Sequence, residues 1–236
     1  MRRCADTTCP PPARYARNRV LTNTAKGVAA MSAADQMSYV ASLVDLSGTL
    51  NVATLVASGT AEWQGPNTVG CTNLVPGSQV TVVRPSASVC MILAVDRSGL
   101  FSAFVLDPTQ SQGWQGPDTV GCPSLVPGSV ITAFQQSPTL FTALVIDRNG
   151  WLNTATLDAG TAAGWQGLNT VGNARLLPGS PVAVCGPSGS TFTAFMVDQD
   201  GALNVATLDT SSSVGWQGPL TIGTCNFSPD ARVSTG

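Results

Sequence analysis

Apolar residues occur along this chain in short runs separated by turn signals. In one stretch, the apolar run at residues 90–95 is followed by the turn Asp-Arg-Ser-Gly and by a second apolar run at residues 100–106. Runs of this length, rich in β-branched and aromatic residues and bounded by Gly, Pro or Asp, are typical of strands. The same pattern predicts strands at residues 114–120 and 130–134, with a Pro-Gly turn between them. Four short strands therefore follow one another.

This succession recurs with a constant period of 51 residues. The triad Trp-Gln-Gly marks each repeat, at residues 63–65, 114–116, 165–167 and 216–218. The register needs no insertion or deletion from about residue 39 to residue 233. A period near 50 with four strands is typical of a β-propeller blade, and the sustained i, i+3, i+4 spacing of a helical solenoid is absent from the repeats. We therefore predict an all-β propeller built of four 51-residue, four-stranded blades, with essentially no helix after residue 37.

Charge divides the chain into two parts. Residues 1–19 carry five arginines and one acid, whereas the remainder carries six basic residues and twelve acids. We expect residues 1–20 to be a basic, disordered tail and residues 21–236 to form the propeller, with repeats centred on Trp63, Trp114, Trp165 and Trp216. An acidic body is not suited to nucleic acid or to an anionic membrane surface.

Two further absences bear on location. No apolar stretch approaches 18 residues, so no membrane insertion is expected. The arginines at the start are followed by a polar, proline-containing segment and not by an apolar core, so no signal peptide is recognised and a soluble protein is expected.

The chain contains no histidine, which removes the commonest general base and every Ser-His or Cys-His nucleophile. Four aspartates share one register, and each opens an Asp-x-x-Gly turn in which an Asx side chain caps its own backbone. They are Asp45, Asp96, Asp147 and Asp198. The seven cysteines form no disulfide or zinc framework. We therefore predict no catalytic residue, no metal site, no cofactor and no enzymatic activity, with carboxylate-based glycoside hydrolysis as the third alternative.

The repeated aromatic and amide side chains are the candidate binding residues. A Trp face packs against the apolar C–H face of a pyranose, while amides take the hydroxyl groups. The candidates are Trp63, Gln64, Trp114, Gln115, Trp165, Gln166, Trp216 and Gln217. In the alternative interpretation, each Trp wedges between blades as core and the following Gln caps a strand edge.

Asparagine is depleted in strands, so its recurrence within them asks for a reason. Asn51, Asn153 and Asn204 share one register and are further sugar-binding candidates, although Ser102 replaces them in the second repeat. Trp151 is unique to the third repeat, follows a turn, and is the last candidate.

The repeat resembles that of bacterial PLL-like β-propeller lectins. The resemblance rests on the pattern Val-Asp-x-x-Gly-x-Leu-Asn, then Trp-Gln-Gly-Pro-x-Thr-Val-Gly, then Leu-x-Pro-Gly-Ser. In the first repeat these motifs lie at residues 44–51, 63–70 and 74–78, and the likeness covers roughly residues 38–232. The resemblance implies sugar binding, often of fucose-like residues, in pockets where adjacent blades meet. That family has seven blades, whereas four repeats are present here, and the second aromatic expected in each blade is represented only by Phe104.

We therefore predict a lectin with several equivalent, weak sugar sites between blades, whose partners are glycans, fucosylated ones among them. Equivalent sites on one rigid body gain avidity on a target that displays many copies of its ligand. The alternative is a non-enzymatic propeller scaffold that binds a protein partner, or a propeller fragment of a larger protein. Ring closure leaves two possibilities, which are a closed four-bladed monomer and a homo-oligomer formed through the terminal blades.

Overall fold

The computed structural model describes residues 37–56, 62–69, 73–107, 113–121, 124–161, 163–172, 175–186, 190–223 and 227. Every regular element in these ranges is a β-strand, as the repeat predicts. No helix in the described ranges could cross a membrane. The proposed tail at residues 1–20 lies outside them.

The strands form four antiparallel sheets, one per repeat, which we call blades 1 to 4. Blade 1 contains β1 (Met37–Val44), β2 (Leu50–Val56) and β3 (Glu62–Val69). Blade 2 contains β4 (Thr81–Val83), β5 (Cys90–Val95), β6 (Phe101–Leu106) and β7 (Trp114–Val120). Blade 3 contains β8 (Thr132–Gln135), β9 (Leu140–Ile146), β10 (Leu152–Asp158) and β11 (Trp165–Val171). Blade 4 contains β12 (Ala183–Cys185), β13 (Thr191–Val197), β14 (Leu203–Asp209) and β15 (Trp216–Gly223).

Strand order within each sheet follows the sequence, which is the pattern of consecutive hairpins. Four-stranded blades are thus confirmed for blades 2 to 4. Blade 1 has three strands among the described residues. The expected strands of the second repeat are confirmed, with β8 beginning two residues later than the pattern suggests.

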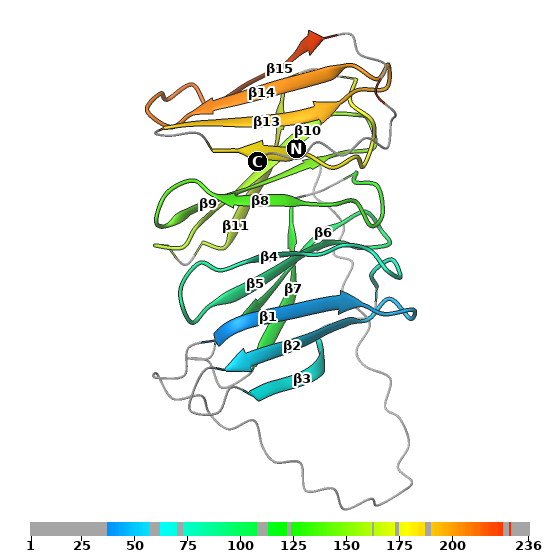
Figure 1. Ribbon diagram of the computed structural model, residues 1–236, viewed down its shortest axis with the longest axis vertical. Helices are drawn as coiled ribbons and strands as arrows, with labels where there is room; N and C mark the ends of the chain where they lie inside the picture. The colour runs from blue at the N-terminus through cyan, green and yellow to red at the C-terminus, as the bar shows by residue number, and fades with distance from the viewer. Residues whose placement is uncertain are drawn as a thin grey trace, which may run out of the picture.

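The blades stack face to face in sequence order, with blade 1 and blade 4 at opposite ends of the long axis (Figure 1). Hydrogen bonds join the first strands of neighbouring blades. The Thr81 hydroxyl donates to the carbonyl of Ile131, and the Thr132 hydroxyl donates to the carbonyl of Val182 at 2.5 Å. The described residues therefore form an open row, and a closed four-bladed ring is not the arrangement found.

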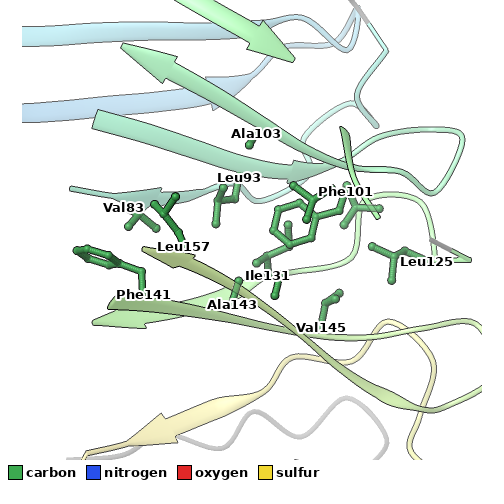
Figure 2. Packing of buried hydrophobic residues seen from close by; sticks show 13 residues of the cluster. Val83, Leu93, Phe101, Ala103, Leu125, Ile131, Phe141, Ala143, Val145 and Leu157 are labelled. Carbon is green, nitrogen blue, oxygen red and sulfur yellow. The ribbon is translucent and has the colours of Figure 1, made fainter. Parts of the chain in front are cut away.

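The hydrophobic core lies between the blades rather than inside any one of them. One cluster joins blades 1 and 2, a second joins blades 2 and 3, and a third joins blades 3 and 4. In the second cluster, Phe101 and Leu93 from blade 2 meet Phe141 and Leu157 from blade 3 (Figure 2). A middle strand such as β9 is covered on both faces, and for this reason it is apolar at nearly every position rather than at alternate ones.

The Asp-x-x-Gly turns connect the blades along one rim. The Asp96 carboxylate accepts hydrogen bonds from the backbone N–H groups of Ser98 and Leu100 at 2.8 and 2.9 Å, and the other three aspartates cap their turns in the same way. The Gly99 carbonyl accepts the N–H of Leu125, in the segment that leads to the next blade. Arg148 of the next turn donates to the Leu125 carbonyl at 2.7 Å. The structural interpretation of the aspartates is confirmed.

Two cysteines lie within the described ranges, and neither forms a disulfide. Cys90 is buried, and burial raises the pKa of its thiol to about 11. Such a thiol is almost entirely protonated near neutral pH and is a poor nucleophile. Cys90 is thus a small residue of the buried core. Cys185 is half-buried, and the remaining five cysteines lie outside the described ranges.

Candidate functional site

The repeated tryptophans of blades 2 to 4 pack against the preceding blade, at the start of the last strand. The ring of Trp165 lies 6.1 Å from that of Phe101, and Trp216 meets Phe134 edge-on at 6.2 Å. Trp114 packs against the cluster between blades 1 and 2. All three are half-buried, so each ring belongs in part to the core and keeps an accessible portion. Trp63, which has no preceding blade among the described residues, is 52% exposed.

A hollow of about 250 Å³ opens between blades 2 and 3 beside Trp165. On the side of blade 2 it is lined by Val105 of β6 and by Asp118 and Thr119 of β7. On the side of blade 3 it is lined by Gly164 and by Trp165. An aromatic residue and an acidic residue thus line one cleft, whereas the side chain of Thr119, the residue after Asp118 in the strand, points to the other face of the blade. Such a combination of an apolar wall with a few polar groups is typical of small-ligand sites.

The indole N–H of Trp165 is buried, and no hydrogen-bond acceptor reaches it among the described residues. A buried donor left without a partner costs about 1–3 kcal/mol. The hydroxyl of Thr154, at the interface of blades 3 and 4, is likewise buried without a partner there. Its register equivalent, Ala103, lines the hollow beside Trp165. Polar atoms that could take a further hydrogen-bond partner therefore occur at two successive interfaces.

The three interfaces share one frame but differ in the residues at the lining positions. At the positions of Val105, Asp118 and Thr119, the interface of blades 1 and 2 carries Thr54, Asn67 and Thr68, and that of blades 3 and 4 carries Thr156, Asn169 and Thr170. Of these three positions, only the middle interface has a carboxylate. The expected equivalence of sites therefore extends to the backbone frame and the tryptophan, but not to the polar groups.

The four glutamines that follow the tryptophans are exposed. Successive residues of a strand point to opposite faces, so a Trp and the Gln after it do not line the same cleft. Gln115 pairs in register with Val105, which lines the hollow beside Trp165. Gln115 therefore shares the face of Val105 that is directed to blade 3, although it is not among the residues that line the hollow. By the same register, Gln64 lies on the face of blade 1 that is directed to blade 2.

The asparagine candidates are held in internal hydrogen bonds. The amide group of Asn204 donates to Asp198 Oδ2 at 2.9 Å and to the Ala202 carbonyl at 3.1 Å, and its oxygen accepts from Thr221 at 2.9 Å. Asn51 makes the corresponding three bonds, and Asn153 makes two of them. In the second repeat, where Ser102 stands instead, Asn73 donates to Asp96 Oδ2 at 3.0 Å. Asn73 thus supplies to Asp96 the hydrogen bond that the strand asparagine supplies in the first and fourth repeats.

Replacing Asn204 by Ala is expected to lower the free energy of unfolding by about 1–3 kcal/mol, because Asp198 and Thr221 lose a buried partner. Urea unfolding of the variant measures this loss. The matched control is Asn149→Ala, at an exposed position of another turn, which is expected to be nearly neutral. A role in ligand contact predicts the opposite result for Asn204→Ala, with unchanged stability and lost sugar binding.

Trp151 lies in the turn between β9 and β10 and is half-buried. Its backbone N–H donates to Asp147, and its carbonyl accepts from Asn153. Trp151 is not among the residues that line the hollow beside Trp165. The structure thus places this candidate on the rim of Asp-x-x-Gly turns, and its role in sugar binding stays a prediction.

The described residues contain no cluster of three His, Cys, Asp or Glu side chains that could hold a metal ion. The carboxylate of Asp45 illustrates what the turn aspartates do instead. The Ser47 hydroxyl donates to it at 2.6 Å, and this bond, followed by that from the Thr49 N–H, lowers the pKa of Asp45 to about 2. A carboxylate held ionised in this way caps the turn and is a poor proton donor near neutral pH.

A larger hollow, of about 420 Å³, lies between β1 and the turn before β4. Its lining includes Ser42, Leu43, Ser78 and Gln79, and it has no aromatic residue. It is also more open than the hollow beside Trp165. It therefore lacks the flat apolar surface on which a sugar ring packs, and we regard the cleft of Trp165 as the candidate site.

No family model and no curated protein sequence matches this chain. Among solved structures, the fold is similar to that of the BP39L lectin from Burkholderia pseudomallei, with a TM-score of 0.68 and 25% sequence identity. The match covers 81% of this chain and 54% of that lectin. The resemblance seen in the repeat motif is confirmed at the level of structure.

The fold is also similar to that of the six-bladed fucose-recognising lectin of Aleuria aurantia, with a TM-score of 0.53 and 17% identity over 76% of this chain and 54% of that one. A form of that lectin in complex with Fucα1-6GlcNAc gives a TM-score of 0.51 at 17% identity, over 75% and 55% of the two chains. These likenesses show that the sheets are propeller blades. The chain spans about half the length of the lectins that it matches.

Proposed function

We propose that this protein is a lectin that binds sugars in the clefts between successive blades. The observation that carries the proposal is the hollow beside Trp165, which is lined by this aromatic residue and by the carboxylate residue Asp118. The similarity to propeller lectins supports it, because those proteins are lectins built on blades of the same kind. Fold alone does not determine function, so the proposal rests on this site.

The cleft divides the recognition of a sugar between its two walls. The accessible part of the Trp165 ring offers an apolar surface to the C–H face of a pyranose. On the opposite wall, the Asp118 carboxylate accepts hydrogen bonds from sugar hydroxyl groups. A charge-assisted bond to Asp118 is stronger than a neutral one, so this residue contributes most to orientation.

Fucose-type sugars are the first ligands to test, since the Aleuria aurantia lectin recognises fucose. Because the polar lining differs from one interface to the next, we expect the clefts of one chain to differ in affinity and in preferred sugar. Several weak clefts on one rigid row gain affinity together for a surface that displays many glycans. Only one carboxylate lines the described cleft, so the two-carboxylate arrangement of glycoside hydrolysis is absent from it.

Binding to immobilised fucosylated glycans, with competition by methyl-α-L-fucoside, tests the proposal. Asp118→Asn is expected to weaken binding at its cleft by about tenfold or more, because a charge-assisted hydrogen bond is lost. Its side chain is exposed, so the fold should be unaffected. Asp200→Asn is the matched control, because it removes the same charge from an exposed turn in blade 4.

Trp165→Ala is the second variant and is expected to abolish binding at the middle cleft, with the fold checked by circular dichroism. Binding that no monosaccharide competes for, or that Asp118→Asn and Trp165→Ala leave unchanged, contradicts the proposal. Such a result favours the alternative of a scaffold that binds a protein partner.

A further inference from the structure

We propose that copies of this chain bind each other head to tail through the two ends of the blade row. We call the face of a blade that points to the preceding blade its leading face, and the opposite face its trailing face. The leading face of blade 1 and the trailing face of blade 4 have no neighbouring blade among the described residues, although Phe227 is hydrogen-bonded to the Gly201 carbonyl of blade 4. In the assembled form, the trailing face of blade 4 in one copy covers the leading face of blade 1 in the next copy.

The leading face of blade 1 exposes two aromatic side chains whose equivalents are less exposed in the later blades. Tyr39, Leu55 and Trp63 pair in register across β1, β2 and β3, so their side chains share this face. Tyr39 is 65% exposed, whereas Cys90 and Phe141 at its position are buried and Phe192 is half-buried. Trp63 is 52% exposed, whereas its three equivalents are half-buried. A preceding blade therefore reduces the exposure of both positions.

Leu43 repeats this contrast on the same face. It is 56% exposed, whereas Ala94, Val145 and Met196, which occupy its register position in blades 2 to 4, are buried. Leu43 and Trp63 together make the exposed face of blade 1 apolar, like the faces that are buried between blades. An exposed apolar patch of this kind marks an interaction site.

The trailing face of blade 4 also exposes apolar side chains. Ile222 is 59% exposed, whereas Val69, Val120 and Val171, its equivalents by the 51-residue repeat, are buried against the next blade. In blade 4 the strand register shifts by one residue at this point, so that Gly223 pairs with Leu203. Leu220 nearby is 70% exposed. An apolar side chain therefore stands at each end of the row where the repeat provides for a further blade.

A second copy fits because the contact already exists three times within the chain. Trailing faces of blades 1, 2 and 3 each pack on the leading face of the next blade. Blade 4 against blade 1 of a second copy continues this series by one step of the repeat. Trp63 would then lie against Leu203 of the second copy, at the register positions where Trp165 packs on Phe101.

Such a contact joins different faces of the two copies, so the assembly can either close into a ring or grow into a longer row. Two copies contribute four blades each, and propellers of up to eight blades are known. A ring of two copies would cover both ends of each chain. The contact needs no change within the described blades.

Light scattering on the full-length protein over a range of concentrations tests the proposal. We expect the mass to rise with concentration from 24.1 kDa toward twice that value or beyond. A monomer at every concentration overturns the proposal.

Two variants identify the faces. Leu43→Asp places a charge on the leading face, and Ile222→Asp places one on the trailing face; both positions are exposed, so each blade should still fold. Each variant alone is expected to weaken association by about tenfold or more. An equimolar mixture is expected to recover pairing, because each variant keeps the face that the other lacks.

Leu46→Asp, at a turn position that is 92% exposed, is the control and should associate as the unmodified protein does. Circular dichroism and thermal melting verify that the variants are folded, and Leu43→Ala and Ile222→Ala replace any variant that is not. Normal pairing by either face variant alone, or a mixture that stays monomeric, overturns the head-to-tail contact.

Discussion

Replacing Gly150 by Ala is expected to destabilise the protein by about 3 kcal/mol or more, a large effect for the addition of a single methyl group. Gly150 has a φ of +77°, and a Cβ at this position would lie 2.4 Å from the carbonyl oxygen of Leu176. Two costs add, because the left-handed backbone is strained for an L-residue and the approaching backbone cannot give way. Urea unfolding of the variant measures their sum.

Gly215→Ala separates the two costs. Gly215 has a nearly identical φ of +75°, but nothing lies within 4 Å of its Cβ position. Its substitution should cost only the backbone strain, about 1–2 kcal/mol. If both variants lose the same free energy of unfolding, the close contact between the Gly150 turn and the Leu176 backbone does not contribute to stability.

Phe101→Ala is expected to lower the free energy of unfolding by about 3–5 kcal/mol, as is usual for a large aromatic residue lost from a core. Phe101 is fully buried between blades 2 and 3 and contacts the ring of Trp165. Its removal leaves a cavity that the neighbouring β-strands, held by hydrogen bonds on both sides, cannot collapse to fill. Chemical unfolding measures the loss.

The same variant links stability to the candidate site. Trp165 loses the ring that supports it, so sugar binding at the middle cleft should weaken even at temperatures where the protein stays folded. Leu46→Ala, at an exposed turn position, should change neither property. A stability loss below about 1 kcal/mol for Phe101→Ala would mean that the core does not lie between the blades.

Much of the fold could be predicted from the repeat, because each 51-residue unit carries its own strands and turns. The pattern of apolar residues and turn signals predicted the bounds of β7 to the residue, and the Asp-x-x-Gly motif located each turn. These features depend on local geometry and on contacts between neighbouring repeats. A periodic sequence reports such contacts four times over.

The outcome at the two ends could not be predicted in the same way. Whether the blades close into a ring depends on the angle between neighbouring blades, and no single residue of the sequence determines that angle. A closed ring of four was one possibility consistent with the repeat, and the blades instead form an open row (Figure 1). The exposure of Trp63, where its three equivalents are half-buried, reveals the end of the row.

The role of the clefts between blades as binding sites stays a prediction, but the structure does show where the candidate residues lie. Trp165 does stand at a cleft between blades, as the pattern suggested, but the neighbouring Gln166 points to the other face of the strand. Asp118 was missed because it varies between repeats, with Asn67 and Asn169 at its equivalent positions. Residues that differ between otherwise similar repeats were the signal that could have identified it.

The role of the asparagines in ligand contact stays a prediction. Their recurrence in the strands also has a structural explanation, because the amide of Asn204 is hydrogen-bonded to Asp198, Ala202 and Thr221. An asparagine within a strand needs partners, and a sequence alone does not tell whether those partners are internal. The turn aspartate six residues earlier was the local clue that they are.

The proton NMR signal of the Trp165 indole N–H, followed during titration with methyl-α-L-fucoside, tests the proposed binding site most directly. That N–H is buried at the cleft and has no acceptor among the described residues, and Trp165→Phe assigns its signal. Sugar binding in the inter-blade cleft predicts a saturable shift of this signal, reduced in Asp118→Asn and unchanged in Asp200→Asn. A Trp165 signal that does not move with this sugar, or with any sugar that the protein binds on a glycan array, would contradict the proposal that the inter-blade cleft is the binding site.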